Sequence, residues 1–370
     1  MPMKTVLHIV GARPNFMKVA PIHRALRERG KLRQVLVHTG QHYDVNMSDV
    51  FFTDLGLPAP DVHLGVGSGS HADQTGKVMM ELEKLFERDR PDLVSVVGDV
   101  NSTLAAALVA AKMLIPLAHV EAGLRSFDRT MPEEINRIVT DRLADFLLTP
   151  SRDGDENLLK EGVDKARIFF VGNVMIDSLL QAKASAEKLP TLTKLELTPG
   201  AYAVCTLHRA SNVDDRAILQ GLLHVLGTVS ESVPVVFPVH PRTRKMLADL
   251  GLNDTLARYR SLKLVDPLGY LDFLCLTSQA KLILTDSGGL QEESTALGVP
   301  CLTLRENTER PITVEIGTNL VVGMDPAVIL REANKILQGH GKKGRIPELW
   351  DGHAADRIAE LYEQVLLAAR

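Results

Sequence analysis

Short apolar runs separated by longer helical patterns limit the possible folds of this chain. The runs are rich in Val, Ile and Leu and lack alternation of apolar with polar residues, which is typical of strands buried on both faces of a parallel sheet. The first series of expected strands covers residues 5–10, 34–38, 93–97, 116–120, 146–149 and 168–171. A second series covers residues 201–207, 233–239, 262–265, 281–285, 300–304 and 319–322. The pattern predicts an α/β protein with two doubly wound, Rossmann-like domains.

The boundary between the two predicted domains falls where the strand signal is weakest. At 370 residues the chain is too long for one ordinary core and suits two domains of similar size. Residues 172–200 contain one helical pattern followed by a loop rich in Pro, Thr and Lys, which fits a crossing between domains. We therefore expect an N-terminal domain over residues 1–171 and a C-terminal domain over residues 172–352. A final helix over residues 353–370, with apolar residues on one face, is expected to pack back on the N-terminal domain.

Composition excludes several classes of protein. Hydrophobic residues make up 45% of the chain and charged residues 24%, as in soluble globular proteins. The formal net charge of −4 gives no general attraction to nucleic acid or to an anionic membrane. The longest apolar stretch, residues 104–111, is far shorter than the ~20 residues that span a bilayer. The N-terminus has no cleavable signal pattern, and the three widely spaced cysteines lack metal-ligand spacing. We therefore expect a cytoplasmic protein with reduced thiols and with no nucleic-acid or membrane partner.

Carboxylates follow the predicted strands of the N-terminal domain. In open α/β sheets ligands bind beyond the carboxyl ends of the strands, so chemistry is expected there. Asp99 follows one strand in "VVGDVNST", and Glu121 follows the next in "HVEAGLRS". Glu133 and Glu134 lie in the first turn of a helix that begins in "MPEEINR". Each carboxylate alone could be a helix cap or a solvated residue. Several at one edge indicate acid and base groups instead, because like charges in one site push their pKa values apart.

Basic residues and glycines follow other strands. "GARPNFMK", after the first strand, provides Arg13 and Lys18. In the C-terminal domain "CTLHRASN" and "PVHPRTR" each place a His and an Arg just beyond a strand, and "LILTDSGGLQEES" runs from a strand into Ser287, Gly288 and Gly289 at the start of a helix. Backbone N–H groups point outward at such a helix start, and glycine lets a phosphate approach closely. We therefore expect an acid/base site in one domain and an anion-binding site in the other, facing each other across a central cleft.

Two other patterns are set aside. "GVGSGS" at residues 65–70 is similar to a dinucleotide-binding fingerprint, but Ser70 stands where the third glycine is required, so we interpret it as a loop. The basic cluster "KKGR" at residues 342–345 is too short to indicate nucleic-acid binding and is interpreted as a solvated loop.

Eight motifs in a fixed order give the chain a resemblance to a known family. They are "GARPNFMKVAP", "TGQHYD", "GDVNST", "HVEAGLRS", "PEEINR", "LHRASN", "DSGGLQEE" and "ENTERP". They span residue 5 to about residue 325 and resemble the motifs of non-hydrolysing UDP-N-acetylglucosamine 2-epimerases. The resemblance implies the glycosyltransferase-B fold, in which two Rossmann-like domains face a central cleft. It also implies a homodimer that interconverts UDP-N-acetylglucosamine (UDP-GlcNAc) and UDP-N-acetylmannosamine (UDP-ManNAc) for cell-surface polysaccharide synthesis, without a nicotinamide cofactor or a metal.

The resemblance further implies an elimination mechanism. The proton on C2 of the sugar is not beside a carbonyl and is poorly acidic. UDP leaves as that proton is removed, giving a 2-acetamidoglucal intermediate, and UDP adds back as C2 is reprotonated on its other face. Asp99, Glu121 and Glu133 match the acid/base carboxylates of the family, with Glu134 as the competing choice for the third. His208 matches a catalytic group at the departing diphosphate.

The remaining matched residues are implied to bind the substrate. Arg13 matches a group at the diphosphate, and Lys18 matches an essential lysine of the first helix. The phosphate loop is matched by Ser287, Gly288 and Gly289, the ribose-binding carboxylate by Glu293, a further substrate contact by Arg310, and the uracil site by the backbone of Leu268 and by Phe273.

Several departures from the family pattern leave the substrate open. Many members have a Thr and a Glu where this chain has Ala12 and Asn15, and an Arg and a Glu where it has Ala210 and Ser211. Residues 41–44, Gln-His-Tyr-Asp, differ from the Gln-His-Arg-Gln of members with an allosteric substrate site. A related UDP-sugar, such as a 2,3-diacetamido uronate, is therefore an alternative substrate. A glycosyltransferase of the same fold, a hydrolysing epimerase and a catalytically silent sugar-nucleotide sensor are the competing classes.

Overall fold

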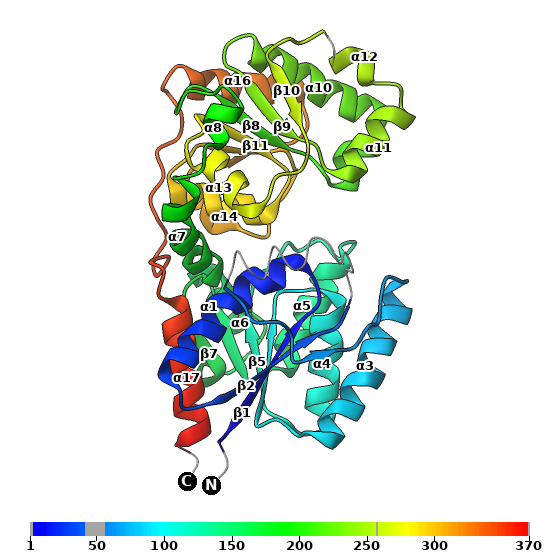
Figure 1. The fold of residues 1–370 in the computed structure, drawn as a ribbon, viewed down its shortest axis with the longest axis vertical. Coiled ribbons are helices and arrows are strands. Elements are labelled where there is room, and N and C mark those ends of the chain that lie inside the picture. Colours follow the sequence, from blue (N-terminus) through cyan, green and yellow to red (C-terminus); the bar gives the residue numbers. More distant parts are fainter. Residues whose placement is uncertain (1–2, 41–55, 257, 369–370) are drawn as a thin grey trace. The chain divides into compact units, whose positions relative to one another are not determined.

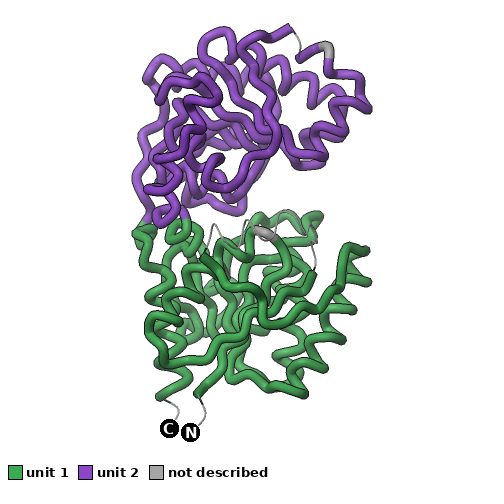
Figure 2. Tube along the Cα trace, viewed as in Figure 1, with its two compact units in different colours: residues 1–178, 348–370 green, residues 179–347 purple. Residues whose placement is uncertain are grey.

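The structure is a computed structural model that describes residues 3–40, 56–256 and 258–368 (Figure 1). The chain divides into two compact units, which Figure 2 shows in different colours. Unit 1 comprises residues 1–178 and 348–370, and unit 2 comprises residues 179–347. Each unit is built around one parallel sheet with helices packed on it.

Unit 1 contains a seven-stranded sheet in which all strand pairs are parallel. In spatial order its strands are β3 (Val62–His63), β2 (Arg33–His38), β1 (Thr5–Val10), β4 (Leu93–Val97), β5 (Leu117–Val120), β6 (Phe146–Thr149) and β7 (Ile168–Phe170). The register of β1 with β2 runs from the Thr5–Arg33 pair to the Val10–His38 pair. Six of the strands lie where the apolar runs predict them. The strand β3 is not among the predicted ones, because two residues are too few to give a pattern.

Helices cover both faces of the unit 1 sheet (Figure 1). They are α1 (Arg13–Arg29), α3 (His71–Arg88), α4 (Asn101–Lys112), α5 (Pro132–Leu143), α6 (Arg152–Lys160), the short 3₁₀ helix η1 (Lys165–Arg167), α7 (Val174–Ala186) and α17 (Ala354–Leu367). Leu7 of β1 and Val94 of β4 belong to a buried cluster with residues of α3 and α4. Ser95, the next residue of β4, faces the other side, where its hydroxyl lies 2.8 Å from the hydroxyl of Tyr362 on α17. Burial on both faces explains why the strands lack alternation.

The chain leaves unit 1 within α7, after residue 178, whereas the weak strand signal predicts a boundary after residue 171. It returns to unit 1 at residue 348, and α17 then packs on α1. The indole N–H of Trp350 donates to the carbonyl oxygen of Pro150 at 2.9 Å. Asp177 of α7 caps α17, because its carboxylate accepts the backbone N–H of Ala355 at 2.7 Å. Unit 1 is therefore assembled from two separated segments of the chain.

Unit 2 contains a six-stranded parallel sheet. In spatial order its strands are β10 (Leu262–Val265), β9 (Val235–Pro238), β8 (Ala203–Thr206), β11 (Leu282–Thr285), β12 (Cys301–Thr303) and β13 (Asn319–Val321), all at predicted positions. Its helices are α8 (Thr191–Lys194), α9 (Ala210–Val213), α10 (Arg216–Ser230), α11 (Pro241–Asp249), α12 (Asn253–Leu256), α13 (Tyr270–Ser278), α14 (Gly288–Leu297), α15 (Pro311–Glu315) and α16 (Pro326–Leu337). Leu223 of α10 and Ile329 of α16 are fully buried in the cluster that joins these helices to the sheet.

The strand order of each sheet reverses at one point. In unit 1 the strand β1 lies between β2 and β4, and in unit 2 the strand β8 lies between β9 and β11. Ligands of doubly wound sheets bind at the carboxyl ends of the strands on either side of such a reversal. The predicted doubly wound α/β architecture is thus confirmed for both units. Ligand-binding residues are expected in the loops after β1, β4, β8 and β11.

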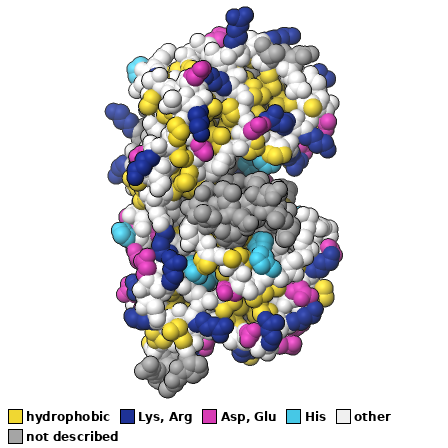
Figure 3. Space-filling model, viewed as in Figure 1, with side chains coloured by type: hydrophobic (Ala, Val, Ile, Leu, Met, Phe, Trp, Pro, Cys, Tyr) yellow, Lys and Arg dark blue, Asp and Glu magenta, His cyan; other side chains and the backbone are white. Residues whose placement is uncertain are grey.

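The surface carries mixed charge. On the face shown in Figure 3, basic and acidic side chains are interspersed on each unit. None of the helices in the described ranges combines the length and the apolar content that crossing a lipid bilayer requires.

Candidate active site

Glu121 is the first residue after β5 and has an unusual backbone conformation. Its φ is +73°, in the left-handed region that non-glycine residues rarely adopt and that costs about 1–3 kcal/mol. The N–H groups of Glu121 and Ala122 both bind the carbonyl oxygen of Leu148 on β6, at 2.9 and 3.1 Å. The buried carboxylate forms an ion pair with Lys18 of α1. Backbone strain held in place by such contacts clusters at functional sites, so Glu121 is a candidate functional residue.

Gly98, between β4 and Asp99, brings a second loop against this ion pair. Its φ of +66° favours glycine. A Cβ atom at Gly98 would lie 3.4 Å from Lys18 Nζ and 3.7 Å from Glu121 Oε2. The loop after β4 therefore meets the ion pair that joins α1 to the loop after β5.

Asn15 links the loop after β1 to the end of β4. Its side-chain oxygen accepts the N–H groups of Gly11 and Ala12, at 3.2 and 2.9 Å, and its amide nitrogen donates to Val97 O at 2.9 Å. The three hydrogen bonds use both ends of the amide, so Asn15 holds the entry to α1 in this chain.

Arg137 on α5 connects two of the carboxylates. Its guanidinium forms ion pairs with Asp99 and with Glu134, the latter at 2.6 Å. The Arg137 side chain is buried, whereas that of Asp99 is 29% exposed. The neighbouring Asn136 donates to the backbone oxygen of Asp99 at 2.9 Å. Sequence reasoning missed Arg137, although its spacing of three and four residues from Glu134 and Glu133 places all three on one side of the helix.

Glu133 and Glu134 have opposite surroundings. Glu134 is 1% exposed and accepts hydrogen bonds from the N–H and the hydroxyl of Ser126 and from the N–H of Phe127, each at 2.9 Å. Together with Arg137 these donors occupy its carboxylate oxygens and fix the loop before α5. Glu133 is exposed, and no described residue forms a hydrogen bond or ion pair with it. Glu133 is therefore the one of the two that is free to exchange a proton with a ligand.

Asp286 organises the loops at the strand reversal of unit 2. It follows β11 and is fully buried. One carboxylate oxygen accepts the N–H groups of His208 and Arg209, each at 2.9 Å, and the other lies 2.7 Å from His208 Nδ1. Burial would raise the pKa of Asp286, but the contacts with His208 and Arg209 outweigh it and lower the pKa. An ionised Asp286 keeps a proton on Nδ1, so Nε2 is the ring nitrogen of His208 that can meet a ligand.

The start of α14 has the form of an anion-binding site. Ser287 is the N-cap residue, its side chain does not cap the helix, and α14 begins at Gly288. The first N–H groups of the helix therefore remain available at the positive end of its dipole. Thr285 Oγ1 accepts the N–H of Ser287 at 2.9 Å, which fixes the turn. A Cβ atom at Gly288 would lie 2.6 Å from Glu309 Oε1, so a larger residue there would displace the Glu309 carboxylate.

Three arginines surround the buried Glu309. Arg305 Nη1 lies 2.9 Å from Glu309 Oε2, and Arg209 Nη2 and Arg310 Nη1 each lie 3.8 Å from Oε1. Burial would raise the pKa of Glu309, but the three arginines lower it to about 2. Arg310 also pairs with Glu292 at 3.0 Å. The three guanidinium groups outnumber the two carboxylates, so the cluster keeps positive charge beside Gly288.

Glu293 on α14 is a buried carboxyl group whose pKa lies well above its ordinary value. Burial, followed by the nearby Glu292, raises its pKa to about 8. No described residue forms a hydrogen bond or ion pair with Glu293. Tyr270, at the start of α13, interacts electrostatically with it, and the buried Tyr270 hydroxyl also lacks a hydrogen-bond partner among the described residues. Buried polar groups without partners are rare, so Glu293 and Tyr270 mark a place where polar groups of a ligand can bind.

Leu268 and Phe273 belong to the segment around α13, the helix that packs on α14, where Glu293 lies. Leu268 comes just before α13, Phe273 lies in its first turns, and both side chains are half-buried. The residues predicted to contact uracil and ribose thus come from α14, from α13 and from the turn before α13.

Comparison with known proteins agrees with these features. The family model described as UDP-N-acetylglucosamine 2-epimerase matches residues 24–363. The chain belongs to this family. A UDP-N-acetylglucosamine 2-epimerase of Methanocaldococcus jannaschii is 44% identical over 352 residues, which cover 91% of this chain and 95% of that protein. A UDP-2,3-diacetamido-2,3-dideoxy-D-glucuronate 2-epimerase of Pseudomonas aeruginosa is 42% identical over 362 residues, which cover 96% of this chain and 98% of that protein.

The fold is also that of the family. The crystal structure of the Methanocaldococcus jannaschii UDP-GlcNAc 2-epimerase in complex with UDP-GlcNAc and UDP has a TM-score of 0.88 and 43% sequence identity to this chain. The similarity covers 97% of this chain and 99% of the crystallised one. Together with the two parallel sheets, it confirms the predicted glycosyltransferase-B fold class.

Some predicted positions of this epimerase-family chain lie outside the described structure. Arg13 is the first residue of α1, but its side chain is not among the parts described. Residues 41–44, in which the chain differs from family members with an allosteric site, are also outside the described residues. Within the described ranges, no group of three or more His, Cys, Asp or Glu side chains could hold a metal ion.

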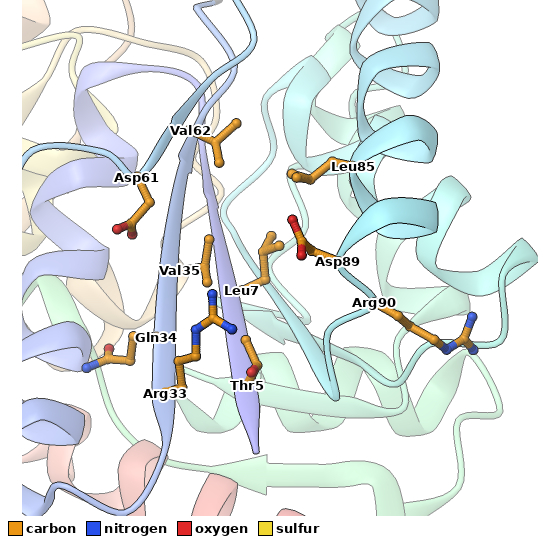
Figure 4. Close-up of a pocket in the computed structure, with 10 residues that line it drawn as sticks. All are labelled: Thr5, Leu7, Arg33, Gln34, Val35, Asp61, Val62, Leu85, Asp89 and Arg90. Atoms are coloured by element: carbon orange, nitrogen blue, oxygen red, sulfur yellow. The ribbon is translucent and has the colours of Figure 1, made fainter. Parts of the chain in front are cut away.

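The pocket shown in Figure 4 is not the candidate active site. Thr5 and Arg33, the first residues of β1 and β2, line it together with Asp61, Asp89 and Arg90. It therefore lies at the amino ends of the strands, opposite to the edge at which ligands of doubly wound sheets bind. None of the predicted site residues lines it.

Proposed function

We propose that this chain catalyses the reversible C2 epimerisation of UDP-GlcNAc to UDP-ManNAc. The observation that carries the proposal is that each unit presents one half of the required chemistry at its own strand reversal. Unit 1 offers Asp99, Glu121 and Glu133 as acid/base groups, and unit 2 offers an anion-binding helix start with a buried carboxyl group beyond it. Membership of the UDP-N-acetylglucosamine 2-epimerase family supports the same reaction.

The reaction proceeds by elimination and re-addition of UDP. A carboxylate removes the proton from C2, the electrons of that bond form the C1–C2 double bond of 2-acetamidoglucal, and the C1–O bond breaks with its electron pair leaving on UDP. In the reverse sense UDP oxygen attacks C1 while a carboxylic acid protonates C2 from the other face. General acid–base catalysis supplies roughly 10²–10⁴-fold of the rate, so the charge developing on UDP must also be stabilised electrostatically.

The proposed roles follow from the surroundings of each residue. Glu121 and Asp99 are fixed by Lys18 and Arg137, whereas Glu133 is exposed and without a described partner, which suits a group that gives and takes a proton. We assign Glu134 to holding the loop before α5 rather than to proton transfer.

Unit 2 is proposed to bind UDP. The N–H groups at Ser287, Gly288 and Gly289 receive the diphosphate, with His208 Nε2 and Arg310 adding positive charge or protons. Arg13 and Lys18 are the proposed substrate-binding groups of unit 1. Glu293 accepts the ribose hydroxyls, and the backbone of Leu268 and the ring of Phe273 hold uracil. This assignment gives the buried Glu293 carboxyl group the partners that it lacks in the protein alone.

A second substrate is supported by one observation. The Pseudomonas aeruginosa relative, named for UDP-2,3-diacetamido-2,3-dideoxy-D-glucuronate, is 42% identical, close to the 44% of the Methanocaldococcus jannaschii relative. The same elimination chemistry would apply to that uronate. Parallel turnover assays with both UDP-sugars decide between them.

The proposal includes a homodimer in the cytoplasm that works without added metal or nicotinamide cofactor. Light scattering of the purified protein tests the oligomeric state. EDTA and NAD should leave turnover unchanged, and a loss with EDTA or a requirement for NAD would contradict the mechanism.

The decisive test is NMR of UDP-GlcNAc incubated with the pure protein in D₂O. Because C2 loses its proton and regains one from solvent-exchangeable groups, both UDP-GlcNAc and UDP-ManNAc should acquire deuterium at C2, with only traces of free UDP. A glycosyltransferase or a sensor would leave C2 unlabelled. A hydrolysing enzyme would accumulate free sugar with stoichiometric UDP, and either result would end the proposal.

A further inference from the structure

His119 is a fully buried histidine on β5, two residues before Glu121. Both of its ring nitrogens have close partners. Nε2 lies 2.8 Å from the carbonyl oxygen of Gly98, and Nδ1 lies 2.6 Å from a carboxylate oxygen of Asp141. Asp141 is on α5, the helix that begins beside Glu133.

The partners of His119 determine its protons. A carbonyl oxygen can only accept, so Nε2 must donate to Gly98; an ionised carboxylate also only accepts, so Nδ1 must donate to Asp141. The second oxygen of Asp141 accepts the N–H of Gly123 at 3.1 Å and lies 2.7 Å from Arg125. Burial would raise the pKa of Asp141, but His119 and Arg125 outweigh it and lower the pKa. With Asp141 ionised, the ring carries two protons and a positive charge.

A buried positive charge on His119 is stable only if nearby negative charges compensate it. Arg125, which is also buried, pairs with Glu161 at 2.7 Å as well as with Asp141. The charged groups that contact one another here are thus two cations, His119 and Arg125, and two anions, Asp141 and Glu161. Their charges cancel, which makes an imidazolium in the interior compatible with a stable fold.

The contacts of this pair lie on both sides of the candidate carboxylates. His119 holds Gly98, the residue before Asp99, and Asp141 holds Gly123, two residues after Glu121. The α-carbon of Gly98 in turn faces the ion pair of Lys18 and Glu121. One His–Asp pair therefore ties together the loop after β4, the loop after β5 and the helix α5.

We propose that His119 donates a hydrogen bond from each ring nitrogen and, with Asp141, positions Asp99 and Glu121 for proton transfer. It is a positioning residue, because its ring nitrogens are both used by the protein. The kinetic part of this inference rests on the proposed epimerase function, whereas the protonation state can be measured without turnover.

NMR of the wild-type protein labelled with ¹⁵N-histidine tests the protonation state. The His119 signals are assigned by their loss in His119→Gln. We expect both ring nitrogens to carry a proton at about pH 7, because each faces a hydrogen-bond acceptor. A single protonated nitrogen at about pH 7 would overturn the inference. If the wild-type protein does not epimerise UDP-GlcNAc, the proposed function fails while this measurement still decides the state of His119.

Two isosteric substitutions test the positioning role. His119→Asn can donate from the place of Nδ1 to Asp141 but loses the bond to Gly98, whereas His119→Gln can donate from the place of Nε2 to Gly98. Because a displacement of about 1 Å at a catalytic group costs roughly 10²-fold in rate, we expect His119→Asn to lower kcat by about 10²-fold and His119→Gln by clearly less. The Kd for UDP should stay close to the wild-type value in both variants, because the groups proposed to hold UDP in unit 2 make no contact with His119.

His8→Gln is the matched control. His8 is fully buried on β1 of the same unit, and its ring contacts Gln34 at 3.2 Å rather than the carboxylate loops. Its substitution should leave kcat close to the wild-type value. A folded His119→Asn with wild-type kcat, or an equal loss of kcat in His8→Gln, would overturn the positioning role. If His119→Asn does not fold, the NMR measurement on the wild-type protein decides whether His119 donates from both ring nitrogens.

Discussion

Two adjacent glutamates on α5, Glu133 and Glu134, differ in what surrounds their side chains. The difference assigns a structural role to Glu134 and a chemical role to Glu133. Glu134 accepts three hydrogen bonds and pairs with Arg137, so removing its charge leaves donors unsatisfied in a buried place. Glu133 makes no described contact, so the same substitution there leaves the fold unchanged.

The pair predicts opposite effects of one chemical change. Glu133→Gln should lower kcat by about 10²-fold or more with unchanged stability, because it removes an acid/base group. Glu134→Gln should lower the free energy of unfolding by about 1.5–3 kcal/mol, because it weakens charge-assisted hydrogen bonds to a buried carboxylate. Urea denaturation and steady-state kinetics of both variants check this. Normal turnover in Glu133→Gln together with unchanged stability of Glu134→Gln would reverse the assignment.

At the scale of elements, α17 closes one face of the unit 1 sheet. Tyr362 of α17 is fully buried and its hydroxyl lies 2.8 Å from that of Ser95 on β4. The two residues are distant in sequence, and their contact joins α17 to a central strand of the sheet. Such a contact contributes little net stability but is costly to leave half made.

A double-mutant cycle measures this contact. Tyr362→Phe should lower the free energy of unfolding by about 1–3 kcal/mol, because Ser95 is left with an unsatisfied buried hydroxyl. Adding Ser95→Ala should recover much of that loss, since both polar groups are then absent. Urea denaturation of the two single variants and the double variant gives the coupling. Strictly additive losses would show that the hydroxyl contact has no role in attaching α17.

At the scale of the whole molecule, one buried carboxyl group links stability to pH. The pKa of Glu293 is about 8 in the folded protein and ordinarily 4.5, so the folded state binds this proton more tightly than the unfolded chain. Its contribution to stability is therefore fully present below about pH 4.5 and is lost as the pH rises through about 8.

Glu293→Gln should remove this dependence. Between pH 5 and pH 8 the wild-type stability should decline by at most about 1.4 kcal/mol per pH unit from this group, and the variant should lack that part of the decline. Urea denaturation across the pH range is the measurement. UDP binding to the wild-type protein should also release protons near neutral pH, because ribose hydroxyls favour the ionised carboxylate; calorimetry in two buffers detects this. Equal pH profiles for wild type and variant would show that Glu293 does not titrate in this range.

Most of the fold and part of the site follow from the sequence, and the reason differs from element to element. Twelve strands of the two sheets give continuous apolar runs, whereas the two residues of β3 give none. The carboxylates after β4 and β5 are recognisable by position because parallel strands end at one edge. The sequence does not reveal the roles of Arg137, Asp141 and Asp286, because these roles depend on partners that only the fold brings near. The unit boundary lies inside α7, where a continuous helical pattern carries no sign of it.

The two-segment construction of unit 1 has a consequence for synthesis on the ribosome. Residues 179–347 emerge as one continuous stretch and can complete their sheet as they appear, whereas the earlier unit must wait for residues 348–370. At roughly 5–20 residues per second, the intervening unit takes on the order of 10–30 s to make. During that time α17 is absent, so the face of β4 that Tyr362 contacts is not yet covered by this helix. The unit whose translation begins first is therefore the last to finish folding.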